Sequence, residues 1–268
     1  SGAERVAQVD IEADRLGVNH PVDLGIVADA RLVAARLREL LDQREVRRTG
    51  WRTPATAERM RRGANNESPY DDVSTATTID PRTVTKALDE MLPMERTVVT
   101  DGGHFSGWPT RHLRVPDVAG WIFMQSFQSI GLGLATAIGA ATARPDRLTV
   151  AALGDGGAMM SIADLETAVR LGRPMLVVVY NDSAYGAEVH HFEPMGFDTG
   201  IVTFPVVDFA ELARGHGADG AVVTRPADLK AVARWLDAGA EGVFVVDVRV
   251  TPSLVADWLT EAFQVEQR

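Results

Sequence analysis

Cysteine is absent from this chain of 268 residues. Disulfides, thiolate metal sites and cysteine nucleophiles are therefore excluded, and the composition fits a reducing compartment. No stretch approaches the roughly 18 consecutive apolar residues of a membrane span. The amino terminus, SGAERVAQVD, also lacks the basic and then apolar pattern of a signal peptide. We therefore expect a cytoplasmic protein with no membrane partner.

The chain also has few basic residues relative to acidic ones. It contains 27 Lys and Arg residues and 37 Asp and Glu residues, for a formal net charge of -10. A basic surface that binds nucleic acid is therefore not expected. With 46% hydrophobic and 24% charged residues, the chain has the composition of a globular protein with one or two hydrophobic cores. It contains no internal repeat and no low-complexity segment.

Strand-like and helix-like segments alternate over residues 79–268. Asp80 precedes Pro81 at the start of the helical segment DPRTVTKALDEML, which is a typical helix beginning. The apolar runs TVVTD, LTVAALGD, MLVVVYND and VFVVDVRV are expected to be strands. The segments SIGLGLATAIGAATA and ADLKAVARWLDAG are expected to be helices between them. This alternation predicts an α/β domain, a doubly wound parallel sheet with helices on both faces.

Residues 1–44 contain too few predicted strands and helices to form a domain. They contain one strand, RVAQVDI, and one helix with an apolar face, DARLVAARLRELL. These two elements are interpreted as the terminal β-α unit of a sheet whose other strands are not in this chain. Residues 45–78 are charged and rich in Ser, Thr and Asn, so we interpret them as a linker with one helix through TAERMRR.

Two acidic turns follow two of the predicted strands. Asp155 ends LTVAALGD and Asp182 ends MLVVVYND, so a β-α-β crossover brings both carboxylates to one edge of the sheet. Gly156 and Gly157 leave room for phosphate oxygens at the backbone, and a helix predicted from near Ser161 directs its positive end to the same place. Two acids and a phosphate repel one another, which favours a bridging Mg²⁺. Taken alone, Gly-Asp-Gly after a strand is a common tight turn.

The whole stretch from Gly154 to Gly186, GDGGAMMSIADLETAVRLGRPMLVVVYNDSAYG, resembles the thiamine diphosphate signature. It is most similar to the diphosphate-binding domain of the acetolactate synthase-like family. The resemblance implies that Asp155, Asp182 and the backbone carbonyl of Ala184 are the Mg²⁺ ligands. Most relatives have Asn at the second position, so Asp182 is a departure, and its neighbour Asn181 is an alternative ligand.

The resemblance also implies a coenzyme site built from further segments. In TDGGHFSGWP, glycine backbone groups and His104 are expected to contact the diphosphate. In SIGLGLATAIGA, Ile130 is expected to lie under the coenzyme rings, and the carbonyl of Gln128, just before it, to accept from the aminopyrimidine. Without the resemblance, Ile130 is simply a core residue and His104 a surface residue of a glycine turn. The predicted coenzyme-binding residues are Gly102, Gly103, His104, Gln128, Ile130, Gly154, Asp155, Gly156, Gly157, Asp182, Ala184, Tyr185 and Gly186.

The activity implied by the resemblance is that of a thiamine diphosphate- and Mg²⁺-dependent enzyme acting on a 2-oxo acid, by decarboxylation with possible carboligation. Family members have a pyrimidine-binding domain, a central domain and a diphosphate-binding domain. This chain corresponds to the tail of the central domain (1–44), a linker (45–78) and the diphosphate-binding domain (79–268). The activating Glu of the family lies in a pyrimidine-binding domain, and neither Glu166 nor Glu188 is in that domain.

We therefore expect the chain to be inactive without a pyrimidine-binding domain, supplied by a missing N-terminal part or another subunit, and to form a homo-oligomer. The sequence does not decide whether FAD is also bound. His190 and His191 are either substrate or acid-base contacts or exposed loop residues, and acetolactate synthases carry Trp at the position of His191.

Two other functions remain open at this point. One is a non-catalytic or regulatory relative that keeps the thiamine diphosphate pocket. The other is a dinucleotide-binding domain, which is disfavoured because G-x-G-x-x-G does not follow the first strand.

Overall fold

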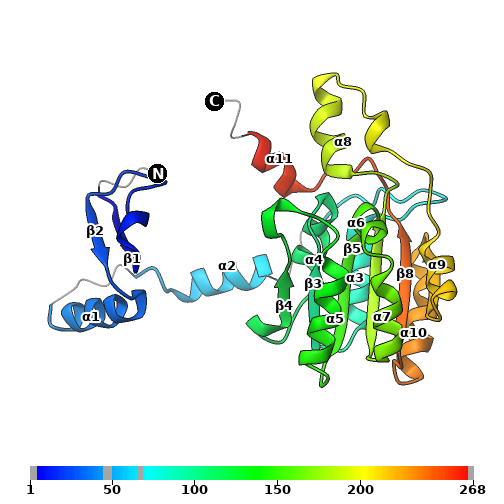
Figure 1. Cartoon of the computed structure of the whole chain (residues 1–268), viewed down its shortest axis with the longest axis horizontal. Helices are drawn as coiled ribbons and strands as arrows, with labels where there is room; N and C mark the ends of the chain where they lie inside the picture. Colours follow the sequence, from blue (N-terminus) through cyan, green and yellow to red (C-terminus); the bar gives the residue numbers. More distant parts are fainter. Residues whose placement is uncertain (1–4, 45–49, 65–68, 265–268) are drawn as a thin grey trace. The chain divides into compact units, whose positions relative to one another are not determined.

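A computed structural model describes residues 5–44, 50–64 and 69–264. The chain divides into two compact units, Ser1–Glu67 and Ser68–Arg268, coloured from blue to cyan and from cyan to red in Figure 1. Each unit is described by itself. No helix in the described part of the chain is long and apolar enough to cross a membrane.

The first unit contains two parallel strands and two helices. Strand β1 (Ala7–Asp10) pairs with β2 (Leu24–Val27), and α1 (Ala30–Asp42) and α2 (Pro54–Ala64) follow. The prediction of one strand missed β2, whose run LGIV is only four residues long. None of the residues of this unit whose burial is described is fully buried. The apolar face expected for α1 is therefore exposed, with Leu32 at 61%.

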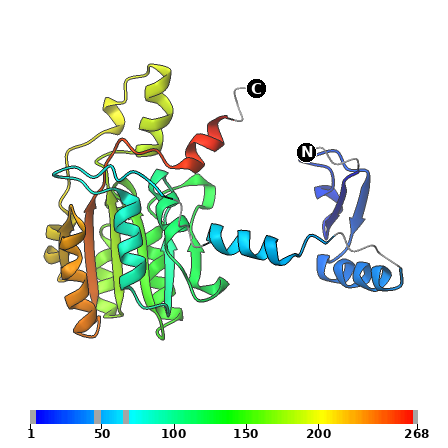
Figure 2. The same cartoon turned by 180° about the vertical axis from the view of Figure 1, so that it is seen from behind.

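The second unit is a six-stranded parallel sheet with the order β4-β3-β5-β6-β8-β7, seen in Figure 2. This confirms the predicted α/β fold. The four predicted strands are β3 (Arg96–Thr100), β5 (Leu148–Gly154), β6 (Met175–Asn181) and β8 (Val243–Arg249). The two strands that were not predicted, β4 (Trp121–Phe123) and β7 (Asp219–Val223), form the two edges of the sheet. An edge strand has one neighbour and is less buried, which weakens its hydrophobic signal.

Helices cover both faces of this sheet. Helices α3 (Pro81–Met91) and α10 (Lys230–Asp237) pack in one hydrophobic core, and α5 (Gly133–Ala143), α7 (Asp164–Leu171) and α9 (Phe209–Gly215) pack in the other. The remaining helices are α4 (Gly107–His112), α6 (Asp155–Met160), α8 (Gly186–Phe192) and α11 (Asp257–Gln264). Figure 1 shows α8 and α11 at the end of the sheet where the strands terminate.

The small residues of α5 allow it to lie close to the sheet. A Cβ atom on Gly133 would lie 2.6 Å from Cδ2 of Leu153 and 2.8 Å from Cβ of Asp101. Close packing therefore explains the Gly- and Ala-rich composition that lowers the intrinsic helix propensity. The helix begins at Gly133 and not at Ser129 as expected, so Ile130 lies in the loop before it.

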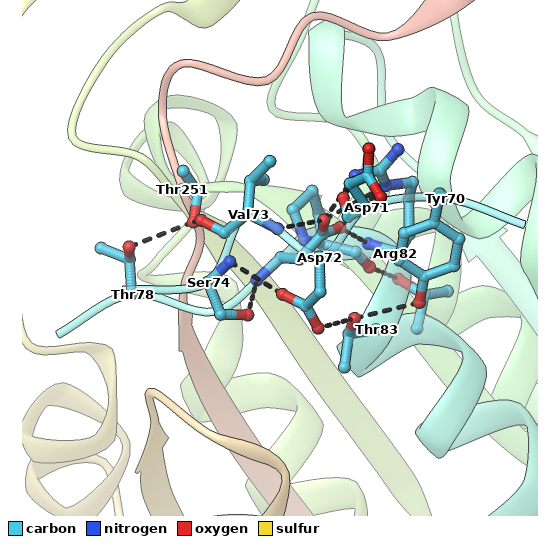
Figure 3. Close-up of polar contacts among 12 residues, drawn as sticks. Tyr70, Asp71, Asp72, Val73, Ser74, Thr78, Arg82, Thr83 and Thr251 are labelled. Atoms are coloured by element: carbon cyan, nitrogen blue, oxygen red, sulfur yellow. Dashed lines mark hydrogen bonds and ion pairs between the residues drawn. The ribbon is translucent and has the colours of Figure 1, made fainter. Parts of the chain in front are cut away.

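A polar network fastens residues 70–74 to the second unit (Figure 3). The hydroxyl of Tyr70 lies 3.0 Å from the hydroxyl of Thr83 on α3, which donates to a carboxylate oxygen of Asp72 at 2.6 Å. The hydroxyl of Thr251 donates to the carbonyl of Val73 at 3.2 Å. The segment predicted as a linker is therefore divided, because residues 69–78 belong to the second unit. The helix expected through TAERMRR is α2, in the first unit.

Candidate functional site

Three acidic residues follow three neighbouring strands. Asp101, Asp155 and Asp182 come directly after β3, β5 and β6, whose pairing aligns Thr100 with Ala152 and Gly154 with Tyr180. Since all three strands are parallel, their carboxyl ends meet at one edge of the sheet. The topology therefore gathers these carboxylates at the place where open α/β sheets bind ligands.

Asp155 is held by backbone N–H groups and is almost fully buried. Its side-chain oxygens accept hydrogen bonds from the N–H of Gly156 at 2.8 Å and the N–H of Ser183 at 2.7 Å. Burial nevertheless raises the pKa of Asp155 to about 6. The neighbouring Asp182 has a pKa raised to about 7, first by burial and then by the charge of Asp155. Each carboxylate therefore penalises ionisation of the other, and a divalent cation between them would remove that penalty.

The side chain of Asn181 points to another part of the protein. Its amide nitrogen donates to the carbonyl of Val207 at 3.0 Å and to a carboxylate oxygen of Asp247 at 2.9 Å. Asp247 is fully buried and also accepts from the N–H of Phe209. Asn181 thus anchors the end of β6, and the residue of this pair that lines the cavity is Asp182.

Asp101 was not predicted as a functional residue. It is fully buried and accepts hydrogen bonds from the N–H of Gly102 at 2.8 Å and the N–H of Gly131 at 2.7 Å. These contacts fix the loop that carries Ile130. Its position directly after the apolar run TVVT, which parallels that of the other two acids, was the available sequence signal.

A small cavity of about 70 Å³ lies between these strand ends. Every predicted coenzyme-binding residue except Gln128 lines it, together with Phe105, Tyr180, Ala187 and Glu188. Gln128 is exposed and has a left-handed backbone with φ of 58°. Ile130 is half-buried and lines the cavity, so it is not the core residue that its type alone suggests.

Several glycines line this cavity, so that parts of its wall are backbone and not side chain. A Cβ atom on Gly156 would collide with the ring of Tyr185, and one on Gly157 would lie 2.6 Å from Oδ2 of Asp101. A Cβ atom on Gly186 would lie 2.5 Å from Oδ2 of Asp182. No larger residue fits at these positions without a shift, which leaves main-chain groups to contact a ligand.

The helix predicted from near Ser161 begins earlier. The chain turns directly from β5 into α6 at Asp155, with an extended Gly154 before it, and Ser161 ends that helix. The next helix, α7, begins at Asp164. The prediction was wrong because the glycines after Asp155 were interpreted as a loop, whereas they form the first turn of α6.

His104 is buried, with 6% of its surface exposed, and is not a surface residue. Its Nε2 accepts a hydrogen bond from the N–H of Ala256 at 2.7 Å, and its carbonyl accepts from Nε1 of Trp258 at 3.3 Å. Burial, and then the nearby His190, lower the pKa of His104 to about 3. The imidazole is therefore neutral near physiological pH.

The two adjacent histidines lie on α8 and not in a loop. The ring of His190 is 4.4 Å from that of His104, and burial lowers the pKa of His190. The ring of His191 packs at 4.7 Å against that of Phe192. Only His190 of this pair is therefore beside the ring of His104.

The donor set fits a divalent cation bound to a phosphate. The lining of the cavity includes the carboxylates of Asp155 and Asp182 together with Ala184 and several glycines. Oxygen ligands of this kind suit Mg²⁺. In the described part of the chain, no group of three or more His, Asp or Glu side chains is placed to hold a metal ion.

Residues 101–248 match the family model described as "Thiamine pyrophosphate enzyme, C-terminal TPP binding domain". This match covers more than half of the chain, so the chain belongs to the thiamine pyrophosphate-dependent enzyme family, and it is acetolactate synthase-like. It contains the domain that binds the coenzyme.

Sequence relatives agree with this assignment. The acetolactate synthase large subunit of Parasynechococcus marenigrum is 30% identical over 82% of this chain and 35% of its own length. The acetolactate synthase of Bacillus subtilis is 33% identical over 68% of this chain and 33% of its own length.

The thiamine diphosphate-dependent 4-hydroxybenzoylformate decarboxylase of Rhodococcus jostii shares the fold, with a TM-score of 0.70 at 22% identity over 93% of this chain and 44% of that chain. Overall the chain spans between 33% and 41% of the length of the curated relatives it matches.

Proposed function

We propose that this chain is the diphosphate- and Mg²⁺-binding part of an enzyme that uses thiamine diphosphate to act on a 2-oxo acid. One observation carries the proposal: the buried Asp155 and the half-buried Asp182 line one cavity together with several glycines, and their pKa values are raised to about 6 and about 7. A protein gains nothing in stability from such a pair unless a cation joins it.

The protein groups have distinct roles in this proposal. Asp155, Asp182 and the carbonyl of Ala184 would hold Mg²⁺, and the backbone at Gly156 and Gly157 would contact the diphosphate, with the N–H of Gly156 already donating to Asp155. Bound thiamine diphosphate supplies the nucleophilic carbon and the electron sink that decarboxylation of a 2-oxo acid requires. The chain's own contribution is to orient that group and to neutralise its charge.

The remaining coenzyme contacts come from the loop before α5. Ile130 lines the cavity and is proposed to support the coenzyme rings. The carbonyl of Gln128 is proposed to accept from the aminopyrimidine. The left-handed backbone at Gln128, shared with Phe127 at φ of 56°, is a strained conformation of the kind found at binding sites.

Activity is proposed to require a pyrimidine-binding domain, from another part of a longer protein or from another subunit of a homo-oligomer. Glu166 is exposed on α7 and pairs with Arg170 at 2.9 Å, and Glu188 lines the cavity from α8. Both belong to the unit proposed to bind the diphosphate, so the activating Glu is proposed to come from the pyrimidine-binding domain. The limited share of its relatives' length that this chain spans supports the same proposal.

Calorimetric titration of the purified chain tests the binding proposal. We expect thiamine diphosphate to bind in the presence of Mg²⁺ and to bind at least about tenfold more weakly without it. Binding of NAD at comparable affinity, or binding of thiamine diphosphate that does not depend on Mg²⁺, would contradict the proposal.

Turnover of pyruvate and of an aromatic 2-oxo acid tests the catalytic proposal. Neither is expected to be consumed by the chain alone, and one is expected to be consumed once a pyrimidine-binding domain is supplied. Analysis of the products distinguishes decarboxylation from carboligation. Coenzyme binding without turnover in the reconstituted protein would instead favour a non-catalytic relative.

A further inference from the structure

The C-terminal segment Ala256–Trp258 contacts the site through His104. The N–H of Ala256 donates to Nε2 of His104 at 2.7 Å, and both residues are buried. The indole Nε1 of Trp258 donates to the carbonyl of the same histidine at 3.3 Å. Two hydrogen bonds from a segment about 150 residues further along the chain therefore converge on one residue of the cavity wall.

The hydrogen bond from Ala256 determines which ring nitrogen of His104 carries hydrogen. A nitrogen that accepts an N–H···N hydrogen bond has no proton of its own, so the neutral ring must carry its hydrogen on Nδ1. A Cβ atom built on Gly186 would lie 3.4 Å from Nδ1 of His104 and 2.5 Å from Oδ2 of Asp182. The Nδ1–H group therefore borders the same space as the carboxylate of Asp182.

We propose that the segment Ala256–Trp258 is a positioning element of the anion site, which holds His104 in its Nδ1–H tautomer and so presents a neutral hydrogen-bond donor to a diphosphate oxygen. This inference rests on the proposed function of the cavity. It assigns a role to the start of α11, which lies outside the strand-end loops that form the rest of the site. A ring with the opposite tautomer would direct a lone pair at the anion and repel it.

Gly107 makes this arrangement possible. A Cβ atom on Gly107 would lie 2.6 Å from Cδ1 of Trp258 and 3.1 Å from Cβ of Ala256. The substitution Gly107→Ala therefore pushes away both residues that hold His104, and Gly107 does not line the cavity. An ion pair between Arg111 and Asp257, both largely exposed, also joins this segment to α4, and such surface pairs contribute little.

Long-range ¹⁵N–¹H NMR of the imidazoles in the full chain tests the tautomer directly, with His104→Gln used to assign the signals. We expect His104 to show hydrogen on Nδ1 in the protein alone, and its Nδ1–H signal to move when Mg²⁺ and inorganic pyrophosphate are added. Hydrogen on Nε2 would overturn the inference, whether or not pyrophosphate binds.

Calorimetry with Mg²⁺ and inorganic pyrophosphate measures the consequence. We expect Gly107→Ala to weaken pyrophosphate binding roughly five- to tenfold, about the effect of one misplaced hydrogen bond to a charged group. Gly139→Ala on α5 is the matched control, because a Cβ atom there has nothing within 4 Å, and it should bind like wild type. If Gly107→Ala fails to fold, Trp258→Phe provides the test. This variant keeps an aromatic ring, removes the indole donor and should also weaken pyrophosphate binding.

The two proposals fail in different ways. Wild-type affinity in both Gly107→Ala and Trp258→Phe would overturn the positioning role while leaving the coenzyme site intact. A wild-type chain that binds neither pyrophosphate nor thiamine diphosphate would overturn the proposed function itself.

Discussion

The burial of Asp155 and Asp182, together with the charge of Asp155 beside Asp182, should make the metal-free protein less stable as the pH rises. The folded-state pKa of Asp182 is about 7, against an ordinary value of 3.8. A carboxyl group whose pKa is raised by folding contributes stability that is complete below its unfolded pKa and is lost as the pH rises through its folded pKa. The window for this loss is therefore from about pH 4 to about pH 7.

The substitution Asp182→Asn removes one of the two charges. The raised pKa corresponds to at most about 4 kcal/mol of unfavourable free energy when Asp182 is ionised. Because water entering the cavity screens the pair, we expect about half of this, about 2 kcal/mol, to be recovered in the variant at about pH 8. For a unit of this size that corresponds to a rise in Tm of about 4–8 °C.

Thermal melts with a chelator at about pH 5 and about pH 8 measure this effect. Wild type should lose stability between the two values, the variant should lose less, and saturating Mg²⁺ should reduce the loss in wild type. The exposed Asp237 at the end of α10 provides the control, since Asp237→Asn should leave the pH dependence unchanged. A wild-type Tm that does not fall between these pH values without metal, or a variant that melts below wild type at about pH 8, would refute the reasoning.

Three further substitutions test other parts of the unit. Gly156→Ala places a methyl group against the ring of Tyr185, and we expect titration to show at least about tenfold weaker Mg²⁺–thiamine diphosphate binding. Arg96→Met removes the fully buried guanidinium that pairs with Asp89 and leaves that carboxylate with the more exposed Arg114, and urea denaturation should show a loss of about 3 kcal/mol. Asp101→Asn turns an amide toward backbone N–H groups, and hydrogen exchange in the loop before α5 should become faster, with a loss of about 2 kcal/mol.

The central strands could be predicted because each is buried on both faces. In β5 and β6 almost every residue is buried, which produces continuous apolar runs. The positions of Asp155 and Asp182 follow from the ends of those runs. In contrast, β4 has only three residues at an edge of the sheet, and such a strand carries too little pattern to be recognised.

The environment of His104 could not be predicted from the sequence. Its partners, Ala256 and Trp258, are far away in the chain and contact it through a backbone N–H and an indole that no local pattern marks. The start of α6 was misplaced for a related reason. Glycine is a poor helix former, yet at Gly156 the nearby ring of Tyr185 excludes any larger residue, so tertiary packing overrides local propensity.

The same three strand ends explain why the acids of this site differ in role. The side-chain oxygens of Asp101 accept hydrogen bonds from backbone N–H groups of its own turn and of the loop before α5. Its role is therefore to fix that loop and not to bind a ligand. Asp155 accepts a hydrogen bond from an N–H of the turn that follows β6, and it thereby ties the turns after β5 and β6 together. Asp182 accepts a longer backbone hydrogen bond, at 3.3 Å from the N–H of Ala184. A cation would therefore stabilise the ionised form of Asp182 most. The ionisation of Asp182 is for that reason the most sensitive test of whether a cation binds there.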